Sequence, residues 1–274
     1  MDGTKISWTD ATWNPVTGCT KITPGCDNCY AFDFAERKRG GAAFPNGFDI
    51  QLREHKMFDP LKWREPRRVF VNSMSDVFHE DISDDYIARM FATMALAPRH
   101  QFQVLTKRPG RMRRLLNADS FRVAVINHAV EVAAARKLVE PSMPWPLPNV
   151  WLGVTIESGE YVNRIEVLRK TPAVIRFISA EPLIGPLDLA GKLDGIHWVI
   201  DGGESGNIRR PAEVDWFRAI RDACLDAGVA YLHKQGNARF SGGDKVLDGR
   251  EWHQYPTGTH DGDDVLVSRG RESA

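Results

Sequence analysis

One pattern recurs along this 274-residue chain: a short apolar, β-branched run that ends in polar residues and is followed by a helical pattern. The six clearest runs are RRVFVNSMSD (67–76), HQFQVLTKRP (100–109), NVWLGVTIES (149–158), VIRFISAEPL (174–183), HWVIDGGESG (197–206) and AYLHKQ (230–235). Short runs of this kind are typical of buried strands. Because strands that alternate with helices build parallel βα units, the sequence predicts an α/β fold with a parallel sheet.

Amphipathic helices are predicted between these strands. Ser83 is a suitable N-cap for a helix whose apolar face includes Phe91. A later helix begins near Pro211 and ends at Gly228, with Cys224 on its apolar stripe. Six or seven βα units favour a partial parallel (β/α) barrel, and a doubly wound open sheet is the alternative, because periodicity does not show closure.

A single barrel domain is predicted over residues 1–256. Residues 117–149 fit the alternation poorly, because a helical stretch is followed by the proline-rich PSMPWPLP, and we interpret them as an elaborated connection between two strands. Residues 257–274 lack periodicity and are predicted to be disordered. No apolar run approaches the roughly 20 residues that cross a bilayer, and no leader pattern opens the sequence. We therefore expect a cytoplasmic protein whose thiols stay reduced.

Three of the four cysteines lie on one short stretch, TGCTKITPGCDNCYA. Cys19, Cys26 and Cys29 follow a first strand region, KISWTDATWNPV, and precede a helical pattern, with a Pro-Gly turn in the longer gap. The loop should therefore lie at the carboxyl ends of the strands, where ligands of parallel α/β folds gather. A flexible loop with three sulfur atoms directed inward suits a soft metal centre.

Four explanations compete for this loop. A disulfide is disfavoured in a reducing compartment, and core cysteines are disfavoured because Gly, Pro, Asp and Asn surround them. Structural zinc normally takes four protein ligands. Cys224 is a poor fourth ligand because it lies on an apolar helical stripe, whereas His55 or His79 could serve. The fourth explanation is an iron–sulfur cluster held by three thiolates, with one iron free for an external ligand.

The loop and several later motifs resemble known families. Three cysteines after the first strand of a βα barrel resemble the radical S-adenosylmethionine superfamily, although the first gap of C-x6-C-x2-C is three residues longer than that superfamily's usual spacing. More narrowly, the chain to about residue 256 resembles a three-cysteine family of phage and bacterial proteins. The motifs that carry this resemblance are WNPVTGCTKITPGCDNCYA, NSMSDVFHE, LTKRPGRM, LGVTIES, ISAEPLIGPL and DGGESG.

This resemblance implies a metal centre and a reaction class. It implies that Cys19, Cys26 and Cys29 hold a [4Fe–4S] cluster and that S-adenosylmethionine binds at its open iron. The implied enzyme cleaves S-adenosylmethionine reductively and produces a 5′-deoxyadenosyl radical, which abstracts a hydrogen atom from the substrate. An electron donor such as flavodoxin or ferredoxin is the implied redox partner.

Strand order gives the other polar side chains roles under this resemblance. The predicted cofactor-binding residues are Tyr30, Ser73, Ser75, Asp76, Thr155 and Glu157. The predicted catalytic residues, at the substrate end of the cavity, are Glu181, Asp201, Glu204 and Lys234. For the carboxylates and the lysine, structural ion pairing is the competing explanation, and for Tyr30 it is a place in the core.

The chain carries 36 basic and 36 acidic residues, so nucleic-acid binding would require a local basic patch. TKRPGRMRR supplies one at a strand end, and its predicted nucleic-acid-binding residues are Lys107, Arg108, Arg111, Arg113 and Arg114. With the phage context of the resembling family, this patch favours modification or repair of a DNA or RNA base taken out of the stack. The two alternatives are a zinc-containing, non-catalytic nucleic-acid-binding protein and a radical enzyme acting on a small metabolite or peptide.

Overall fold

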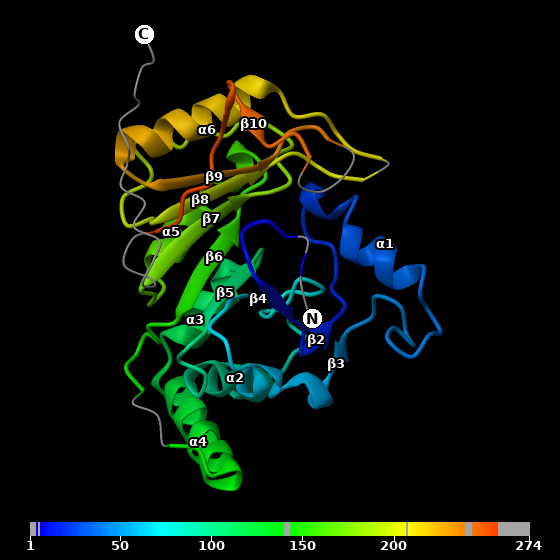
Figure 1. Ribbon diagram of the computed structural model, residues 1–274, viewed down its shortest axis with the longest axis vertical. Helices are drawn as coiled ribbons and strands as arrows, with labels where there is room; N and C mark the ends of the chain where they lie inside the picture. Colours follow the sequence, from blue (N-terminus) through cyan, green and yellow to red (C-terminus); the bar gives the residue numbers. More distant parts are fainter. Residues whose placement is uncertain (1–3, 5, 140–142, 207, 239–242, 257–274) are drawn as a thin grey trace.

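A curled parallel sheet dominates the computed structural model, which describes residues 4, 6–139, 143–206, 208–238 and 243–256. Within these residues, seven parallel strands form the sheet in the order β1-β4-β5-β6-β7-β8-β9. Their bounds are β1 (Ala11–Trp13), β4 (Arg68–Val71), β5 (Gln101–Thr106), β6 (Val150–Thr155), β7 (Ile175–Ala180), β8 (Trp198–Gly202) and β9 (Ala230–Gln235). Figure 1 shows the sheet curling into an open half-barrel, so the predicted partial parallel (β/α) barrel is confirmed.

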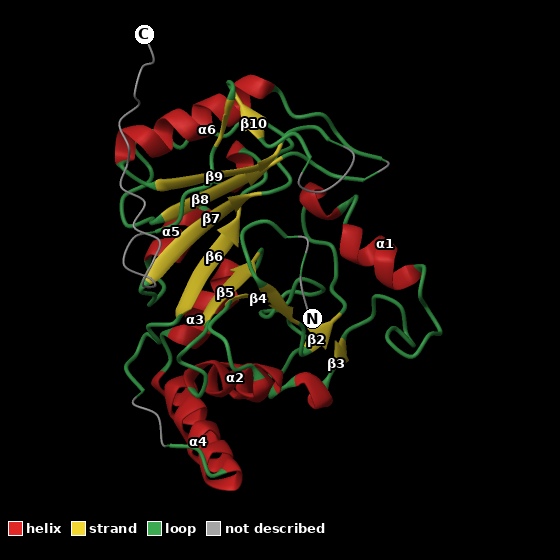
Figure 2. Cartoon of the chain, viewed as in Figure 1, coloured by secondary structure: helices red, strands yellow, loops and turns green. Residues whose placement is uncertain are grey.

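Helices pack along the outer side of this sheet (Figure 2). The helices are α1 (Tyr30–Glu36), α2 (Asp84–Ala95), α3 (Pro109–Leu116), α4 (Asp119–Arg136), α5 (Arg164–Arg169) and α6 (Val214–Ala227). The helix α6 packs against β8 and β9, α5 packs against β6 and β7, and α4 packs on α2. The helix α1 lies on the other side of the sheet from α5, next to the loop with the cysteines.

Two predicted helix boundaries agree with the structure. The Ser83 hydroxyl accepts a hydrogen bond from the Tyr86 N–H at 3.2 Å, which caps α2. The helix α6 ends at Gly228 in the left-handed conformation, with φ +66°, and Cys224 is buried on its inner face. The predicted connection over residues 117–149 contains α4, whereas the predicted disordered tail lies outside the described residues.

Alternate strand residues enter two different apolar clusters, as the two-residue period of a strand requires. On β4, Val69 and Val71 pack with the helices, whereas Phe70 joins an inner cluster on the concave side. The inner cluster consists of Trp8, Phe70, Trp151, Ile175, Phe177, Trp198, Ile200 and Leu232. At Gly153 a Cβ atom would lie 2.4 Å from the Phe177 ring, so this glycine makes room for the aromatic packing. Packed side chains therefore fill the lower part of the half-barrel.

Short elements complete the fold. The strand β2 (Val16–Thr17) pairs antiparallel with β3 (Gln51–Leu52), and β10 (Val246–Leu247) pairs antiparallel with β11 (Arg250–Glu251). The 3-10 helices are η1 (Pro24–Cys26), η2 (Glu54–Lys56), η3 (Asp59–Lys62) and η4 (Gly159–Tyr161). In the part of the chain that the structure describes, none of the helices has the length and apolar character needed to cross a bilayer.

Candidate functional site

The first cysteine is fixed by the backbone that follows β2. Gly18 has φ +93°, and its N–H donates to the Met74 carbonyl at 3.0 Å. A Cβ atom here would lie 2.1 Å from the Asp49 carbonyl oxygen, so only glycine fits this close approach. The N–H of Cys19 donates to the Phe48 carbonyl at 3.2 Å. Backbone bonds therefore fix the position of Cys19 before any ligand binds.

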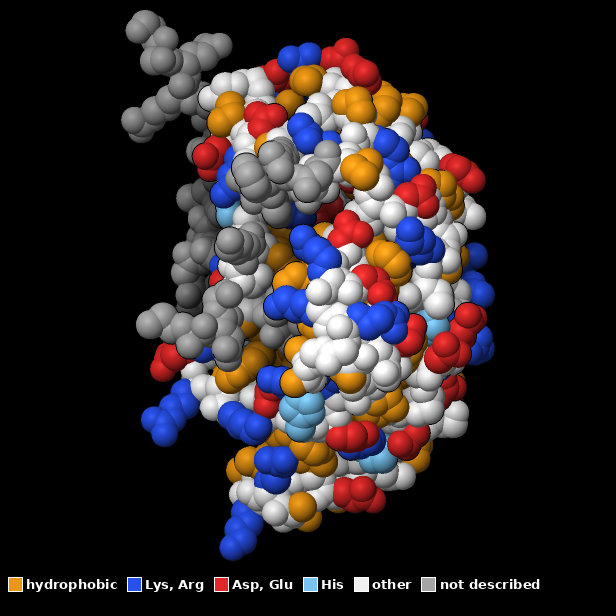
Figure 3. Space-filling view, turned by 90° about the vertical axis from the view of Figure 1, so that its right-hand side faces the viewer, with side chains coloured by type: hydrophobic (Ala, Val, Ile, Leu, Met, Phe, Trp, Pro, Cys, Tyr) orange, Lys and Arg blue, Asp and Glu red, His pale blue; other side chains and the backbone are white. Residues whose placement is uncertain are grey.

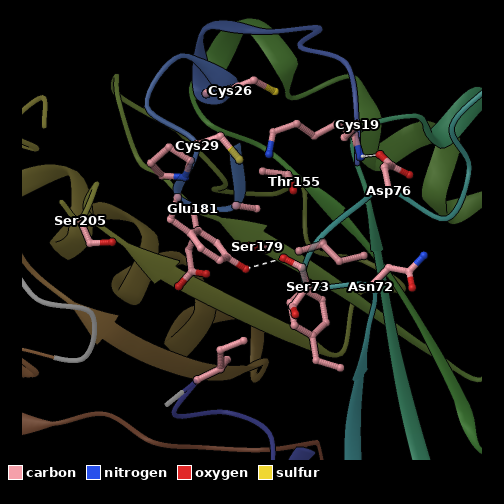
Figure 4. Close-up of a pocket in the computed structure, with 18 of the residues that line it drawn as sticks. Cys19, Cys26, Cys29, Asn72, Ser73, Asp76, Thr155, Ser179, Glu181 and Ser205 are labelled. Atoms are coloured by element: carbon pink, nitrogen blue, oxygen red, sulfur yellow. Dashed lines mark hydrogen bonds between the residues drawn. The ribbon is translucent and has the colours of Figure 1, made fainter. Parts of the chain in front are cut away.

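The other two cysteines lie on one compact turn that leads into α1. Cys26 is the last residue of η1, and its N–H donates to the Thr23 carbonyl at 2.9 Å. Cys29 is the N-cap residue of α1, but its thiol does not cap the helix. All three cysteines are half-buried, and they line one cavity (Figure 4).

The fully buried Glu157 supports the turn from below. Its carboxylate accepts a hydrogen bond from the Thr23 hydroxyl at 2.5 Å and one from Arg164 Nη1 at 2.9 Å. Lys107 Nζ lies 3.9 Å from the same carboxylate. A Cβ atom at Gly25 would lie 2.5 Å from Glu157 Cγ, so the turn rests directly on this side chain. Glu157 is therefore a support for the cysteine loop.

Glu204 ties the same loop to the segment after β8. Its carboxylate accepts hydrogen bonds from Asn28 Nδ2 at 2.9 Å and from Arg210 Nη2 at 2.6 Å. Arg210 also donates to the Pro24 carbonyl at 2.9 Å and pairs with Asp27 at 3.4 Å. Burial raises the pKa of Glu204, but the bonds from Arg210 and Asn28 outweigh it and hold that pKa below its ordinary value.

Arg108 and Asp76 fix the position of the loop around Cys19. Arg108 Nη1 lies 3.5 Å from Cys19 Sγ and 3.3 Å from Asp76 Oδ2, and its Nη2 donates to the Thr20 hydroxyl at 2.9 Å. Asp76 also accepts a hydrogen bond from the Thr106 hydroxyl at 2.7 Å. The loop is thus held by carboxylates that follow β4, β6 and β8.

The thiols have different acidities in this environment. Burial, together with the nearby Asp76 carboxylate, raises the pKa of Cys19 to about 11, although Arg108 opposes the shift. Burial also raises the pKa of Cys26, but the charge of Lys107 and backbone hydrogen bonds outweigh it and lower that pKa below its ordinary value. A metal cation would have to displace the Cys19 proton, as coordination of a thiol does.

The cavity that the cysteines line has a volume of about 600 Å³ and lies at the carboxyl ends of the strands. Figure 4 shows the cysteines around one end and Thr155, Ser179 and Glu181 on the sheet below them. Lys234 Nζ donates to Glu181 Oε2 at 3.2 Å at the other end. Apolar side chains form the floor: Ile6, Trp8, Phe70 and Leu105. The cavity therefore combines a sulfur-rich end, a polar sheet surface and an apolar floor.

Thiolates are the ligands that both zinc and iron–sulfur clusters take. Across the described ranges, no three His, Cys, Asp or Glu side chains lie close enough together to hold one metal ion. Tetrahedral zinc with Zn–S bonds of about 2.3 Å requires sulfur atoms only ~3.8 Å apart, whereas a cluster of several irons accepts thiolates that are farther apart. His79 bonds the Thr20 hydroxyl through Nε2 at 2.8 Å, and His55 is exposed on η2.

Comparison with known proteins identifies the family. A family model described as "Protein of unknown function (DUF5131)" matches residues 3–256. The chain belongs to this family.

No curated protein sequence matches this DUF5131 chain. Among solved structures, a spore photoproduct lyase complexed with dinucleoside spore photoproduct is similar to it, with a TM-score of 0.45 and 14% sequence identity. The similar region covers 81% of this chain and 62% of the lyase chain. This DUF5131 chain thus matches less than two thirds of that protein's length.

Most of the residues predicted for the site line this cavity. The lining includes Cys19, Cys26, Cys29, Tyr30, Ser73, Ser75, Asp76, Lys107, Arg108, Thr155, Glu181, Glu204 and Lys234. Within the lining, Tyr30 donates its hydroxyl to the Ser73 carbonyl at 2.6 Å. Glu157, Asp201, Arg111, Arg113 and Arg114 are not among the lining residues, and Glu157 lies under the cysteine loop as described above.

Asp201 has a different place from the one predicted for it. Its neighbour on β8, Ile200, belongs to the inner cluster, so strand alternation directs Asp201 toward α6. There its carboxylate accepts a hydrogen bond from the Tyr231 hydroxyl at 2.7 Å and lies 2.7 Å from His233 Nδ1. Asp201 is therefore a buried, fully partnered group behind the sheet.

The basic segment divides into inward and outward parts. Lys107 and Arg108 face the cavity, and Arg111 bonds the Ile82 carbonyl and Asp84. Of the five predicted nucleic-acid-binding residues, Arg113 and Arg114 are the exposed ones, and both lie on α3. On the face that Figure 3 shows, basic side chains alternate with acidic ones among the described residues.

Sequence reasoning missed residues that the structure places at the site. Asn72 directly follows β4 and lines the cavity, and its position as the first polar residue after an apolar strand could have identified it. Asn28 and Arg210 hold the cysteine loop through Glu204. Because Arg210 lies far from the loop in the sequence, local patterns give no signal for this contact.

Proposed function

We propose that this protein is an iron–sulfur radical S-adenosylmethionine enzyme. The observation that carries the proposal is the set of three half-buried thiols at one end of a cavity of about 600 Å³, at the carboxyl ends of a curled parallel sheet. Three thiolates are one ligand fewer than structural zinc normally takes, and they leave one iron of a four-iron cluster open. Membership of the family by itself assigns no activity.

The residues of this chain would hold two cofactors. Cys19, Cys26 and Cys29 are the ligands proposed for a [4Fe–4S] cluster. When bound, that cluster supplies the electron that cleaves S-adenosylmethionine to methionine and a 5′-deoxyadenosyl radical. Side chains of the lining, Tyr30, Ser73, Ser75 and Thr155, are proposed to bind the polar groups of S-adenosylmethionine. Asp76, Glu157 and Glu204 act on the cofactors indirectly, because they hold the loop that carries the thiols.

The other end of the cavity is proposed to bind the substrate. Burial raises the pKa of the Glu181 carboxyl, and Lys234 opposes the shift, so a proton can be held between the two groups. The apolar floor keeps water away from the reacting atoms, which protects a radical from side reactions. Glu181 and Lys234 are therefore the residues proposed to move a proton.

A base of DNA or RNA is the proposed substrate, and the reaction would be modification or repair of that base. The apolar floor with Trp8 and Phe70 supports a flat group in the cavity, and Arg113 and Arg114 are exposed on α3 for phosphate contacts. Such a reaction also requires an electron from outside the chain. A flavodoxin or ferredoxin is the proposed donor.

Anaerobic purification and reconstitution test the reaction class. The wild-type chain is expected to bind iron and sulfide and to convert S-adenosylmethionine to 5′-deoxyadenosine with dithionite as the reductant. Cys26→Ala should lose iron and the product. Cys224→Ala is the matched control, because this cysteine is buried on α6 and is not among the residues that line the cavity, and it should keep both.

Two results would refute the proposal. A chain that binds one zinc and no iron would favour a zinc-containing nucleic-acid-binding protein. Full iron content and product formation in Cys26→Ala would show that this thiol is not a ligand. Cleavage of S-adenosylmethionine without salt-dependent binding of DNA or RNA would keep the reaction class and exclude the nucleic-acid substrate.

A further inference from the structure

The guanidinium of Arg108 is fixed beside one of the three cysteines at the carboxyl end of β5. Arg108 Nη1 donates to Cys19 Sγ at 3.5 Å, a hydrogen-bond length that suits the large sulfur atom. The Arg108 side chain is 12% exposed, so this contact is largely removed from water. Figure 4 shows Cys19 and Asp76 next to each other at this end of the cavity.

The local backbone determines where this guanidinium lies. The strand β5 ends at Thr106 and α3 begins at Pro109, so Arg108 occupies the short turn between strand and helix. The Arg108 N–H donates to the Thr106 hydroxyl at 2.8 Å, and the Lys107 N–H donates to Asp76 Oδ2 at 3.0 Å. These bonds fix the turn from which the Arg108 side chain extends to the cysteine loop.

The second nitrogen of the guanidinium keeps the first one next to the thiol. Arg108 Nη2 donates to the Thr20 hydroxyl at 2.9 Å and to the Thr20 carbonyl at 3.2 Å. A guanidinium is planar and its N–H groups have a fixed fork geometry, so holding one nitrogen also orients the other. The protein itself therefore sets the position of the guanidinium beside Cys19.

The Asp76 carboxylate opposes the charge of this guanidinium. Arg108 Nη1 lies 3.3 Å from Asp76 Oδ2, and the Asp76 side chain is 9% exposed. The same carboxylate accepts hydrogen bonds from the Thr106 hydroxyl at 2.7 Å and from the Phe78 N–H at 3.0 Å. The cation is thus in contact with the sulfur, and the carboxylate is in contact with the cation.

Two other cations near the cysteines have different contacts. Lys107 Nζ lies 3.9 Å from Glu157 Oε1, and Arg210 Nη2 lies 2.6 Å from Glu204 Oε1. Both cations pair with the carboxylates that support the cysteine loop, whereas Arg108 donates to a sulfur atom of the loop. Arg108 is therefore placed to act on the thiolate itself.

A positive charge and a hydrogen bond at a thiolate ligand favour the reduced state of an iron–sulfur cluster. One electron from the external donor adds one negative charge, which the cysteine sulfurs share, and a neighbouring cation stabilises that charge. The guanidinium is always protonated, so no proton has to move with the electron. Because Arg108 is largely buried, its charge acts on the sulfur more strongly than an exposed cation would.

We propose that Arg108 raises the reduction potential of the [4Fe–4S] cluster through its hydrogen bond to Cys19, and that Asp76 limits this effect. The inference rests on the proposed function, because it requires a cluster on the three thiolates. It deepens that function by assigning control of the reduction step to two named residues. Arg108 acts through the Cys19 ligand, a role other than the phosphate contact predicted from the basic segment.

Redox titration of the reconstituted full-length chain tests the proposal. The midpoint potential is measured by electron paramagnetic resonance under anaerobic conditions. Arg108→Gln removes one hydrogen bond to a charged group, so reduction should become about tenfold less favourable, which lowers the potential of a one-electron couple by about 59 mV. Asp76→Asn removes the opposing charge and should raise the potential.

Arg89→Gln is the matched control for the loss of a positive charge. Arg89 lies on α2, pairs with Glu54 at 2.6 Å and is not among the residues that line the cavity. This variant loses the same charge as Arg108→Gln, and its potential should equal that of the wild type.

A purely structural role of Arg108 predicts a different pattern. If Arg108 only held the loop, Arg108→Gln would lower Tm and the iron content, but the cluster that forms would keep its potential. Arg108→Lys keeps the charge and loses the fork, so its potential should lie between those of the wild type and Arg108→Gln. The Lys variant keeps the test decisive where Arg108→Gln assembles no cluster.

Two results would overturn the proposal: equal potentials in the wild type and both Arg108 variants, or shifts of the same sign in Arg108→Gln and Asp76→Asn. A wild-type chain that forms no cluster would refute the proposed function and this role with it. A cluster that cleaves S-adenosylmethionine at a potential independent of Arg108 would refute this role alone. The two failures are therefore distinguishable.

Discussion

The polar groups that support the cysteine loop differ from those on the sheet surface of the cavity in how many hydrogen-bond partners they have. At the cysteine end, Glu157 and Glu204 are buried and have several hydrogen-bond partners each. At the sheet surface, Asn72, Ser179 and Glu181 have buried polar atoms without partners among the described residues. Partnered carboxylates stabilise the loop that carries the thiols, whereas unpartnered groups leave hydrogen-bonding capacity for a ligand.

The pKa values of Glu204 and Glu181 are shifted in opposite directions. Glu204 has a pKa below its ordinary value, because its bonds to Arg210 and Asn28 outweigh the effect of burial. Glu181 has a raised pKa, because burial outweighs the charge of Lys234. The supporting carboxyl group is thus easier to ionise than a free one, and the carboxyl group facing the cavity is harder to ionise.

Replacing Glu157 by Gln should have the largest effect on stability. The change leaves the Arg164 guanidinium buried without its counter-charge, and breaking a buried pair in this way costs about 3 kcal/mol. The free energy of unfolding, measured in urea, should fall by that amount. Asp59→Asn removes the half-buried partner of the exposed Lys56 and Lys62 and should cost less than about 1 kcal/mol. Equal losses in the two variants would contradict the supporting role of Glu157.

Replacing Gly25 by Ala should displace the turn between the first two cysteines. Its Cβ atom would lie 2.5 Å from Cγ of Glu157, which is fully buried and bonded to Thr23 and Arg164, so we expect a cost of about 1–3 kcal/mol and a lower iron content. Gly110→Ala is the matched control, because its Cβ atom meets nothing within 4 Å on α3. A Gly25→Ala protein with wild-type iron content would show that the turn tolerates displacement.

The hydrogen bonds that the Glu204 carboxylate accepts from Arg210 and Asn28 should stabilise the protein less in acid. A carboxyl group with a lowered folded pKa stabilises the protein fully above its unfolded pKa, near 4.5, and loses that contribution as the pH falls through the folded value. In Glu204→Gln, the fall in unfolding free energy below pH 4.5 should therefore be shallower than in the wild type. Arg210, which pairs with both Glu204 and Asp27, is kept in both proteins. If unfolding free energy falls with pH equally in the wild type and in Glu204→Gln, the hydrogen bonds of Glu204 do not stabilise the loop.

Reversing the charges of Arg113 and Arg114 should have the smallest effect. Both are exposed on α3, and each phosphate contact that is lost on a single strand lowers the slope of log affinity against log salt by about 0.7. Single-stranded DNA binding of the double Glu variant, measured over a salt series, should show a smaller slope with an unchanged Tm. An unchanged slope would show that α3 does not contact the nucleic acid.

Much of the fold was predictable because its signals are local. The apolar runs of β4 to β9 and the Ser83 cap are visible within a few residues. The curl of the sheet depends on pairings between segments far apart in the chain, so the sequence favoured a partial barrel, which is confirmed, but could not exclude an open sheet. The three cysteines and the strand-end side chains lining the cavity are local signals of the same kind.

The contacts that give these residues their roles were not predictable in the same way. Asn28 bonds Glu204 across 176 positions, and Thr23 bonds Glu157 across 134 positions, so neither support has a sequence signature. Asp201 was placed at the cavity because it ends a strand, but the two-residue period turns its side chain toward α6. Whether a polar group faces a ligand or a neighbour depends on side-chain direction.

The electron paramagnetic resonance spectrum of the reconstituted, dithionite-reduced protein tests the central claim most directly. Three thiolates that leave one iron open predict an iron–sulfur signal that changes when S-adenosylmethionine is added, in the wild type and in Cys224→Ala, and no signal in Cys26→Ala. A protein that gives no cluster signal and holds one zinc per chain, or a signal that S-adenosylmethionine leaves unchanged, would contradict the account.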